Sequence, residues 1–143
     1  MNELRQQAIR LLARREYTHA ELRKKLATAG TAEEIDVVLN DLAGRGLLSD
    51  RRAAASYLRS HGGRFGAARL KQTLRAKGIG EDAIAAGMAE VALPDELERA
   101  RALWQRKFNT APRDQREWAR QARFMQGRGF SVDVITRLLK EPA

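Results

Sequence analysis

The chain has 143 residues, with 27 Lys and Arg against 18 Asp and Glu, a formal net charge of +9 and an isoelectric point near 10.8. It contains no Cys, which excludes disulfide scaffolds, thiolate zinc sites and Cys nucleophiles, and it has no apolar run long enough to span a membrane. Ala and Leu are abundant, Val and Ile are scarce, and no segment alternates apolar and polar residues over a length that predicts a strand. The composition therefore predicts an all-α, soluble and cytoplasmic protein.

The first 48 residues are predicted to form three short helices. Apolar residues at helical spacing indicate the first of them: Leu4, Ala8, Leu11 and Leu12. A capping box of Thr18 with Glu21 starts the second helix, which is predicted to stop at Gly30, and a capping box of Thr31 with Glu34 starts the third.

The next stretch repeats this design at an offset of 48 residues. Asp50 is predicted to cap the fourth helix. The repeated positions then follow in the same register: Gly66, Leu70, Leu74 and Gly78 take the places of Thr18, Leu22, Leu26 and Gly30. A sixth helix is predicted to follow Gly80.

A third, looser copy follows Pro94, with Gln121 in a position that Leu occupies in the other two copies. We therefore predict three tandem three-helix repeats, residues 1–48, 49–92 and 93–143, in an extended, curved array. The alternative is an ordinary helical bundle with accidental internal similarity, but the shared register favours the repeats.

No constellation of residues supports catalysis. His19 and His61 have no partner at metal-ligand spacing. The glycines around Ile79 match a relaxed dinucleotide-binding pattern, but a helix rather than a strand precedes them. We therefore expect no enzymatic activity, no cofactor and no metal.

Positive charge is concentrated in the second and third repeats. Residues 1–48 carry a net charge of only +1, whereas eight bases and no acid lie between Asp50 and Glu81, and residues 99–128 carry a net charge of +7. Such clusters attract phosphate backbones or an acidic protein surface.

One predicted helix separates its charges from its apolar residues. At 100° per residue, Trp118, Ala122 and Met125 fall on one side. Within an arc of about 80° on the opposite side fall four Arg: Arg113, Arg116, Arg120 and Arg123. A solvated face normally mixes charges of both signs, so this arc favours a binding surface over ordinary solvation. The other candidate contacts are Arg64, Lys71, Arg75, Lys77 and Arg128.

Three segments together resemble the RecX family of recombinase regulators: residues 15–30, 48–79 and 128–135. The matching positions are Tyr17, Leu22, Leu26, Gly30, Asp50, Gly66, Leu70, Leu74, Gly78, Gly129 and Phe130. Ala53-Ala54 and Gly127 depart from the family pattern, which puts local packing and one basic contact in question.

The resemblance implies three tandem three-helix repeats and a protein that binds the RecA filament on single-stranded DNA. Such a protein blocks filament growth and lowers ATP hydrolysis, strand exchange and repressor cleavage, with direct contact to single- or double-stranded DNA left open. We expect the protein to be a monomer. The alternative is a helical DNA-binding regulator with helix-turn-helix-like units, for which Arg120-Gln121 supplies a partial base-reading set.

Overall fold

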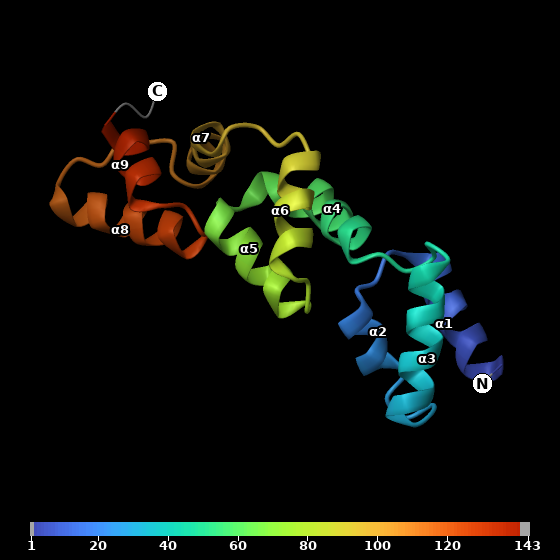
Figure 1. The fold of residues 1–143 in the computed structure, drawn as a ribbon. Coiled ribbons are helices and arrows are strands. Elements are labelled where there is room, and N and C mark those ends of the chain that lie inside the picture. Colours follow the sequence, from blue (N-terminus) through green and yellow to red (C-terminus); the bar gives the residue numbers. More distant parts are fainter. Residues whose placement is uncertain (1, 141–143) are drawn as a thin grey trace. The chain divides into compact units, whose positions relative to one another are not determined.

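The computed structural model describes residues 2–140, which form nine α-helices, one short 3-10 helix and no strand (Figure 1). The prediction of an all-α fold is therefore confirmed. In chain order the elements are α1 (Asn2–Arg14), α2 (His19–Lys25), α3 (Ala32–Gly44), α4 (Asp50–His61), η1 (Gly62–Arg64), α5 (Ala67–Ala76), α6 (Glu81–Glu90), α7 (Glu96–Lys107), α8 (Gln115–Gly127) and α9 (Val132–Lys140). Among these described residues, none of the helices combines the length and hydropathy that a membrane span requires.

The described chain packs as two compact units. The N-terminal unit contains residues 2–57 and 74–90, and the C-terminal unit contains residues 58–73 and 91–140. The second sequence repeat is thus divided between the units, so the repeats and the packing units are different divisions of the same chain.

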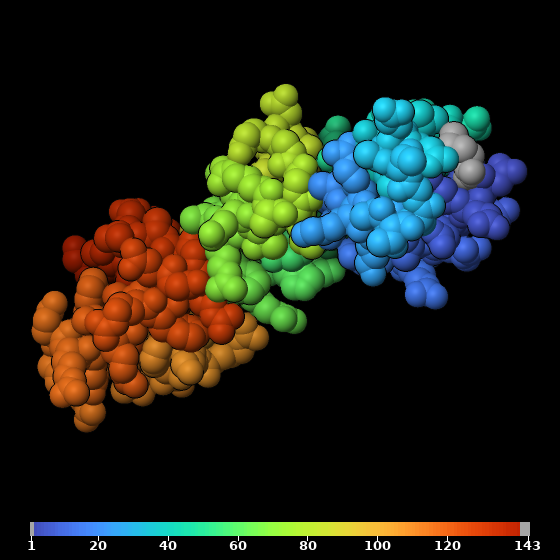
Figure 2. All heavy atoms as spheres, turned by 90° about the horizontal axis from the view of Figure 1, so that it is seen from below, coloured from blue at the N-terminus to red at the C-terminus, as the bar shows by residue number. Residues whose placement is uncertain are grey.

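The core of the N-terminal unit lies between α1, α2 and α3, with α1 and α2 both in contact with α3. Its buried residues are Leu4, Ala8, Tyr17, Leu22, Leu26, Ile35, Val38, Leu39, Leu42 and Leu48. In the space-filling view the side chains of α2 and α3, blue to cyan, form a continuous surface (Figure 2). The apolar spacing that predicts the helices therefore also predicts this core.

Both predicted capping boxes are present. At the start of α2 the Glu21 amide donates to Thr18 Oγ1 (3.0 Å), and the Thr18 amide donates to Glu21 Oε1 (2.8 Å). The predicted end of α2 is wrong, because the helix ends at Lys25 and the chain continues to Ala29 in turns closed by bonds to the residue three positions earlier. Gly30 lies beyond this turn, where an added Cβ would come within 3.2 Å of Leu4.

The predicted role of Asp50 as the cap of its own helix is also wrong. Ser49 supplies that cap, since its hydroxyl accepts a bond from the Arg52 amide (3.1 Å). Asp50 Oδ1 instead accepts a bond from the His19 amide (2.8 Å), the first amide of α2. The Asp50 carboxylate therefore links α4 to the start of α2. The local sequence pattern gives no sign of this contact.

The C-terminal unit has its own core between α7, α8 and α9. Its buried residues are Ala100, Leu103, Trp104, Met125, Phe130, Val134, Ile135, Leu138 and Leu139. Gln121 is buried in the same region, where it accepts a bond from Trp104 Nε1 (2.7 Å) and donates one to the Thr110 carbonyl (2.9 Å). The polar residue that breaks the repeat pattern thus satisfies a buried indole and a loop carbonyl.

Two glycines of the family pattern bring backbones together within the C-terminal unit. The Gly66 amide donates to the Arg128 carbonyl (2.8 Å), and a Cβ at Gly66 would lie 2.3 Å from the Gly129 oxygen. Gly129 has a φ of +92°, and a Cβ there would lie 2.2 Å from the Cβ of Arg69. This contact holds the start of α5 against the turn between α8 and α9. The other repeated positions of α5 are buried: Leu70 and Leu74.

Candidate functional site

Helix α8 has one apolar and one basic face, as its periodicity predicts. Met125 is buried, and Trp118 and Ala122 pack against the C-terminal core. The opposite face carries three exposed guanidinium groups: Arg116, Arg120 and Arg123. We call these three residues the arginine face. None of them forms an ion pair with a described carboxylate, so their positive charge is available to a partner.

Arg113 does not belong to this face, and its predicted place on the helix is wrong. Asp114 caps α8, accepting a bond from the Glu117 amide (2.8 Å), so Arg113 precedes the helix. Both its amide (2.9 Å) and its guanidinium (2.8 Å) bind the Glu117 carboxylate. These bonds lower the pKa of Glu117 and raise the pKa of Arg113. Glu117 thus neutralises the charge of Arg113, which the sequence pattern had counted with the other three Arg of the helix.

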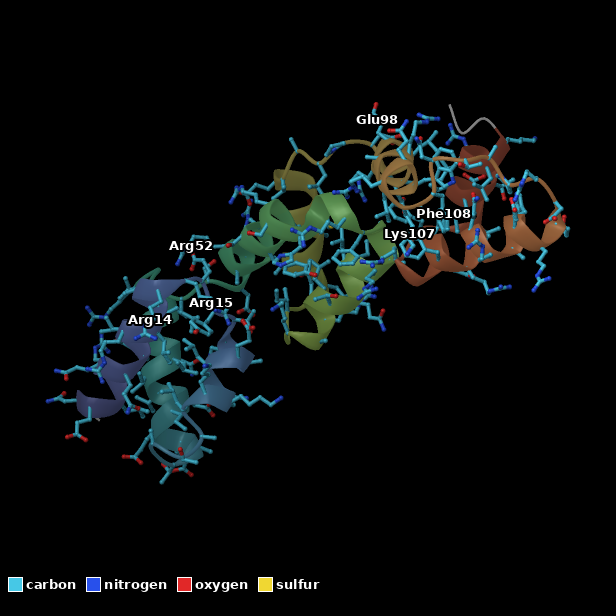
Figure 3. All side chains as sticks on the ribbon, turned by 180° about the vertical axis from the view of Figure 1, so that it is seen from behind. Arg14, Arg15, Arg52, Glu98, Lys107 and Phe108 are labelled. Carbon is cyan, nitrogen blue, oxygen red and sulfur yellow. The ribbon has the colours of Figure 1, made fainter. Side chains whose placement is uncertain are left out.

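Aromatic rings lie beneath several cations of the C-terminal unit. Lys107 and Phe108 lie at the end of α7, near α8 (Figure 3). The Lys107 ammonium lies 5.2 Å from the ring centre of Phe124, and the Arg120 guanidinium lies 5.6 Å from that of Phe108. The two rings meet edge to face at 5.4 Å. Contacts of this kind orient a cation without neutralising it.

Arg128 extends the same arrangement. Its guanidinium lies 5.2 Å from the ring centre of Phe124 and 5.8 Å from that of Phe65. Arg69 lies 4.6 Å from the ring centre of Phe65 and donates to the Gly127 carbonyl (2.9 Å). Lys107, Arg69 and the three rings are not among the contact residues that the sequence pattern predicts. The spacing of four residues between Phe124 and Arg128, and between Phe65 and Arg69, is the signal in the sequence for such contacts.

A cavity of about 410 Å³ opens beside these residues. Its lining consists of Lys107, Phe108, Thr110, Arg113, Glu117, Arg120 and Gln121. Three of the seven are cations, and the single carboxylate is held by Arg113. The cavity therefore presents positive charge next to an aromatic ring.

The basic candidates of the second repeat divide into two groups. Arg64 and Lys71 are exposed and form no ion pair with a described residue. Arg75 pairs with Glu81, which raises the pKa of the guanidinium. Lys77 is half-buried and lies 3.3 Å from Glu21. Arg75 and Lys77 thus hold together the N-terminal unit, to which both belong.

The structure weakens the case for base reading by α8. Gln121, half of the partial base-reading set, is 2% exposed, and both ends of its amide are engaged. Direct readout requires side chains that reach the base edges. Among the described residues there is also no group of three His, Asp or Glu that could hold a metal ion.

Comparisons with known proteins agree with the repeat register. Models of the first, second and third three-helix domains of RecX match residues 5–42, 49–88 and 94–139. The regulatory protein RecX of Leptothrix cholodnii is 46% identical over 138 residues, covering 96% of this chain and 87% of the relative. That of Ralstonia nicotianae is 40% identical, covering 96% and 86%.

Solved structures show the same fold. A crystal structure of regulatory protein RecX superimposes with a TM-score of 0.81 at 27% identity, covering 98% of this chain and 73% of the other. RecX from Lactobacillus salivarius superimposes with the same TM-score at 22% identity, covering 99% and 95%. From the family models and the extent of these identities, the chain belongs to the RecX family of regulatory proteins.

Proposed function

We propose that this protein is a non-enzymatic negative regulator of the RecA recombinase. It binds the filament that RecA forms on single-stranded DNA, in the groove or at the end, and blocks extension. ATP hydrolysis, strand exchange and coprotease activity fall as a result. Membership of a family of regulatory proteins supports the regulatory role, and the resemblance described above supplies RecA as the partner.

The observation that carries the proposal is the exposed arginine face of α8. Arg116, Arg120 and Arg123 lie on one side of a helix whose other side is fixed in a core. Guanidinium groups bind phosphates and carboxylates through two parallel hydrogen bonds. The arginine face therefore suits either the DNA phosphates of the filament or acidic side chains of RecA.

The cations that lie over aromatic rings add to this surface. Lys107, Arg120 and Arg128 are each within 6 Å of a ring centre. Because such a side chain is already ordered, less conformational entropy is lost when it binds an anion. In this proposal the repeats at residues 49–92 and 93–143 supply the basic contacts, and the repeat at residues 1–48 extends the array. The protein acts as a cytoplasmic monomer without a cofactor.

The test removes the arginine face by the triple substitution R116A/R120A/R123A. These residues are exposed, so each change should cost at most about 0.5 kcal/mol of stability. We expect at least a ten-fold weaker affinity for the RecA filament, roughly 1.4 kcal/mol. The plot of log affinity against log salt should also become shallower, by about 0.7 for each lost contact to a single-stranded phosphate. Filament affinity is measured at two or more salt concentrations.

The control variant R59A/R106A/R137A removes the same number of exposed charges elsewhere. If it weakens binding as much as the first variant, only net charge matters and the arginine face has no special role. If the first variant loses affinity for bare single-stranded DNA but inhibits RecA normally, the arginine face serves DNA alone. That result leaves inhibition of RecA intact and assigns the contact with RecA to another surface of the protein.

A further inference from the structure

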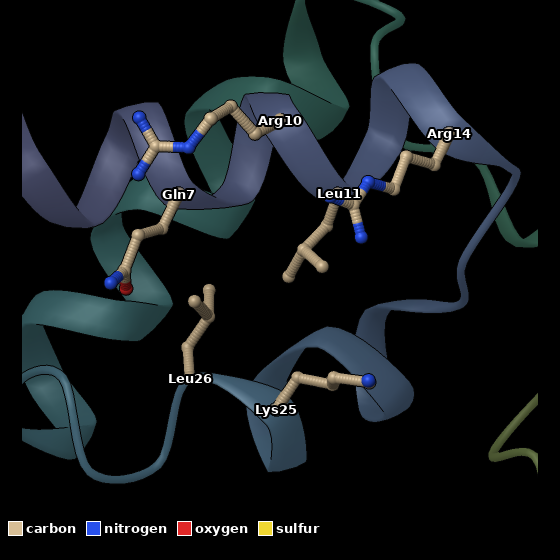
Figure 4. Close-up of a pocket in the computed structure, with 6 residues that line it drawn as sticks. All are labelled: Gln7, Arg10, Leu11, Arg14, Lys25 and Leu26. Carbon is tan, nitrogen blue, oxygen red and sulfur yellow. The ribbon is translucent and has the colours of Figure 1, made fainter.

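A second basic feature lies in the N-terminal unit, in a groove between α1 and α2. The groove has a volume of about 300 Å³. Its lining consists of Gln7, Arg10, Leu11, Arg14, Lys25 and Leu26. Figure 4 shows Leu11 from α1 and Leu26 from the end of α2 pointing toward one another across it. Leu26 is 2% exposed and Leu11 is partly buried, so the apolar floor is small and its accessible part is mainly Leu11, whereas the rim is polar and basic.

The positive charge of this groove is not neutralised within the first repeat. Of the eight bases in residues 1–48, four form ion pairs: Arg5, Arg15, Arg23 and Arg45. The four without an ion pair to a described residue are Arg10, Arg14, Lys24 and Lys25. Three of these line the groove, and no acidic residue within residues 2–140 does. A repeat with a net charge of only +1 thus places three of its four unpaired cations around one groove.

We propose that this groove docks an acidic peptide segment of a partner protein, with an apolar side chain against Leu11. Carboxylates of the segment pair with Arg10, Arg14 and Lys25 on the rim. An amphipathic helix or a short extended segment offers this combination of apolar and acidic groups. The groove is separate from the arginine face, and the proposal does not depend on the function proposed above.

The shape and chemistry of the groove favour a peptide over nucleic acid. No aromatic ring lines the groove, whereas proteins that bind single strands stack bases on aromatic side chains. Phosphates would engage the rim and leave the apolar floor uncovered. A volume of about 300 Å³ is at the small end of the range for ligand pockets, roughly 300–1,000 Å³, and suits one or two side chains.

The proposal is tested on the full chain with a short fluorescein-labelled peptide that has Leu at helical spacing and Glu or Asp elsewhere. Two control peptides carry Gln in place of the acids or Ser in place of Leu. Binding is followed by fluorescence anisotropy. Amide chemical shifts report where the peptide binds, and they detect weak complexes at high concentration. We expect the Leu-and-acid peptide to bind at least about ten-fold more tightly than either control peptide, with shifts at Leu11, Arg14 and Leu26.

Two pairs of variants locate the binding. R14Q/K25Q removes two rim charges and should weaken peptide binding about ten-fold, whereas R59Q/R106Q removes two exposed charges elsewhere and should leave it unchanged. Q7E places an acid in the groove and should weaken binding several-fold. Q6E adds the same charge to the same helix at an exposed position outside the lining and should have little effect. All six substituted residues of these four variants are exposed, and circular dichroism checks the folding of each variant.

Several outcomes overturn the proposal. If the Ser-containing peptide binds as well as the Leu-containing one, the groove exerts only a general attraction for negative charge. If oligothymidylate displaces the peptide and itself binds more weakly to R14Q/K25Q, the occupant is nucleic acid. If no amide of the groove shifts at millimolar peptide, the groove does not dock such a segment.

Discussion

Gln121 shows how a single residue departs from a repeat for a structural reason. The equivalent positions of the first two repeats hold the buried Leu22 and Leu70, and the sequence alone gives no reason for an amide. In the structure the amide binds the Trp104 indole and the Thr110 carbonyl. A buried indole N–H without an acceptor costs about 1–3 kcal/mol. The pairing could not be predicted, because neither partner lies within a helical turn of Gln121.

The contact between Gly66 and Gly129 likewise joins residues far apart in the chain. Helix-ending glycines are predictable from the local pattern. The sequence does not reveal, however, that a Cβ at Gly129 would lie 2.2 Å from one side chain and 2.6 Å from a backbone nitrogen, both of Arg69. This glycine is therefore required by packing as well as by its φ of +92°.

We predict that G129A lowers the free energy of unfolding by about 3 kcal/mol, since it adds backbone strain and a steric clash. The matched control is G127A, two residues earlier. A Cβ at Gly127 would meet nothing within 4 Å, and the residue is helical. That change should be neutral or stabilising, within about 1 kcal/mol. Urea unfolding of both variants tests the pair, and equal stabilities would contradict the packing argument.

At the level of the helices, the sequence reliably predicts contacts between residues within one helical turn. It does not predict contacts between different helices. The capping boxes at Thr18 and Thr31 are present because both partners lie three residues apart. The bond from the His19 amide to the Asp50 carboxylate joins residues 31 positions apart. The pattern around Asp50 therefore predicts a cap for α4 and does not reveal the contact with α2. Arg113 continues the helical spacing of the arginines on α8, but Asp114 caps that helix, so Arg113 precedes it.

Glu21 connects the start of α2 to distant cations and makes stability depend on pH. Burial raises the pKa of Glu21, but the bond from the Thr18 amide and the charges of Lys77 and Arg15 outweigh it, so the pKa lies below its ordinary value of 4.5. The ionised form is therefore favoured by folding. Its contribution is fully present above pH 4.5 and is lost as the pH falls through the lower pKa of the folded state.

We predict that E21Q lowers the free energy of unfolding at pH 7 by about 1 kcal/mol. Gln keeps the capping acceptor, so the change removes mainly the charge. The difference from the wild-type protein should shrink as the pH falls below 4.5. E33Q removes an exposed charge from the first turn of α3 and serves as the control. Denaturant unfolding from pH 7 to pH 3 measures both variants, and a difference for E21Q that stays constant with pH would refute the assignment.

At the scale of the whole molecule, the distribution of charge is predictable, because counting along the sequence is sufficient. The division of the second repeat between two packing units is not. The division depends on which of the two cores each part of α4 and α5 packs against. The apolar residues of these helices would have the same spacing whichever core they joined, so the sequence does not show it. The contact between Lys107 and the Phe124 ring is not predictable either, because the two residues belong to different helices.

The proposed function makes its own prediction at this scale. At near-stoichiometric amounts the protein should inhibit the DNA-dependent ATPase of RecA and should hydrolyse no ATP itself. The charge that drives association lies on exposed side chains, so inhibition should weaken as salt rises. A coupled ATPase assay at low salt, with the R116A/R120A/R123A variant alongside, measures the effect. If RecA turnover is unchanged by an excess of the protein, the proposal is wrong. If saturating DNA abolishes the inhibition, the protein competes for DNA and does not act on the filament.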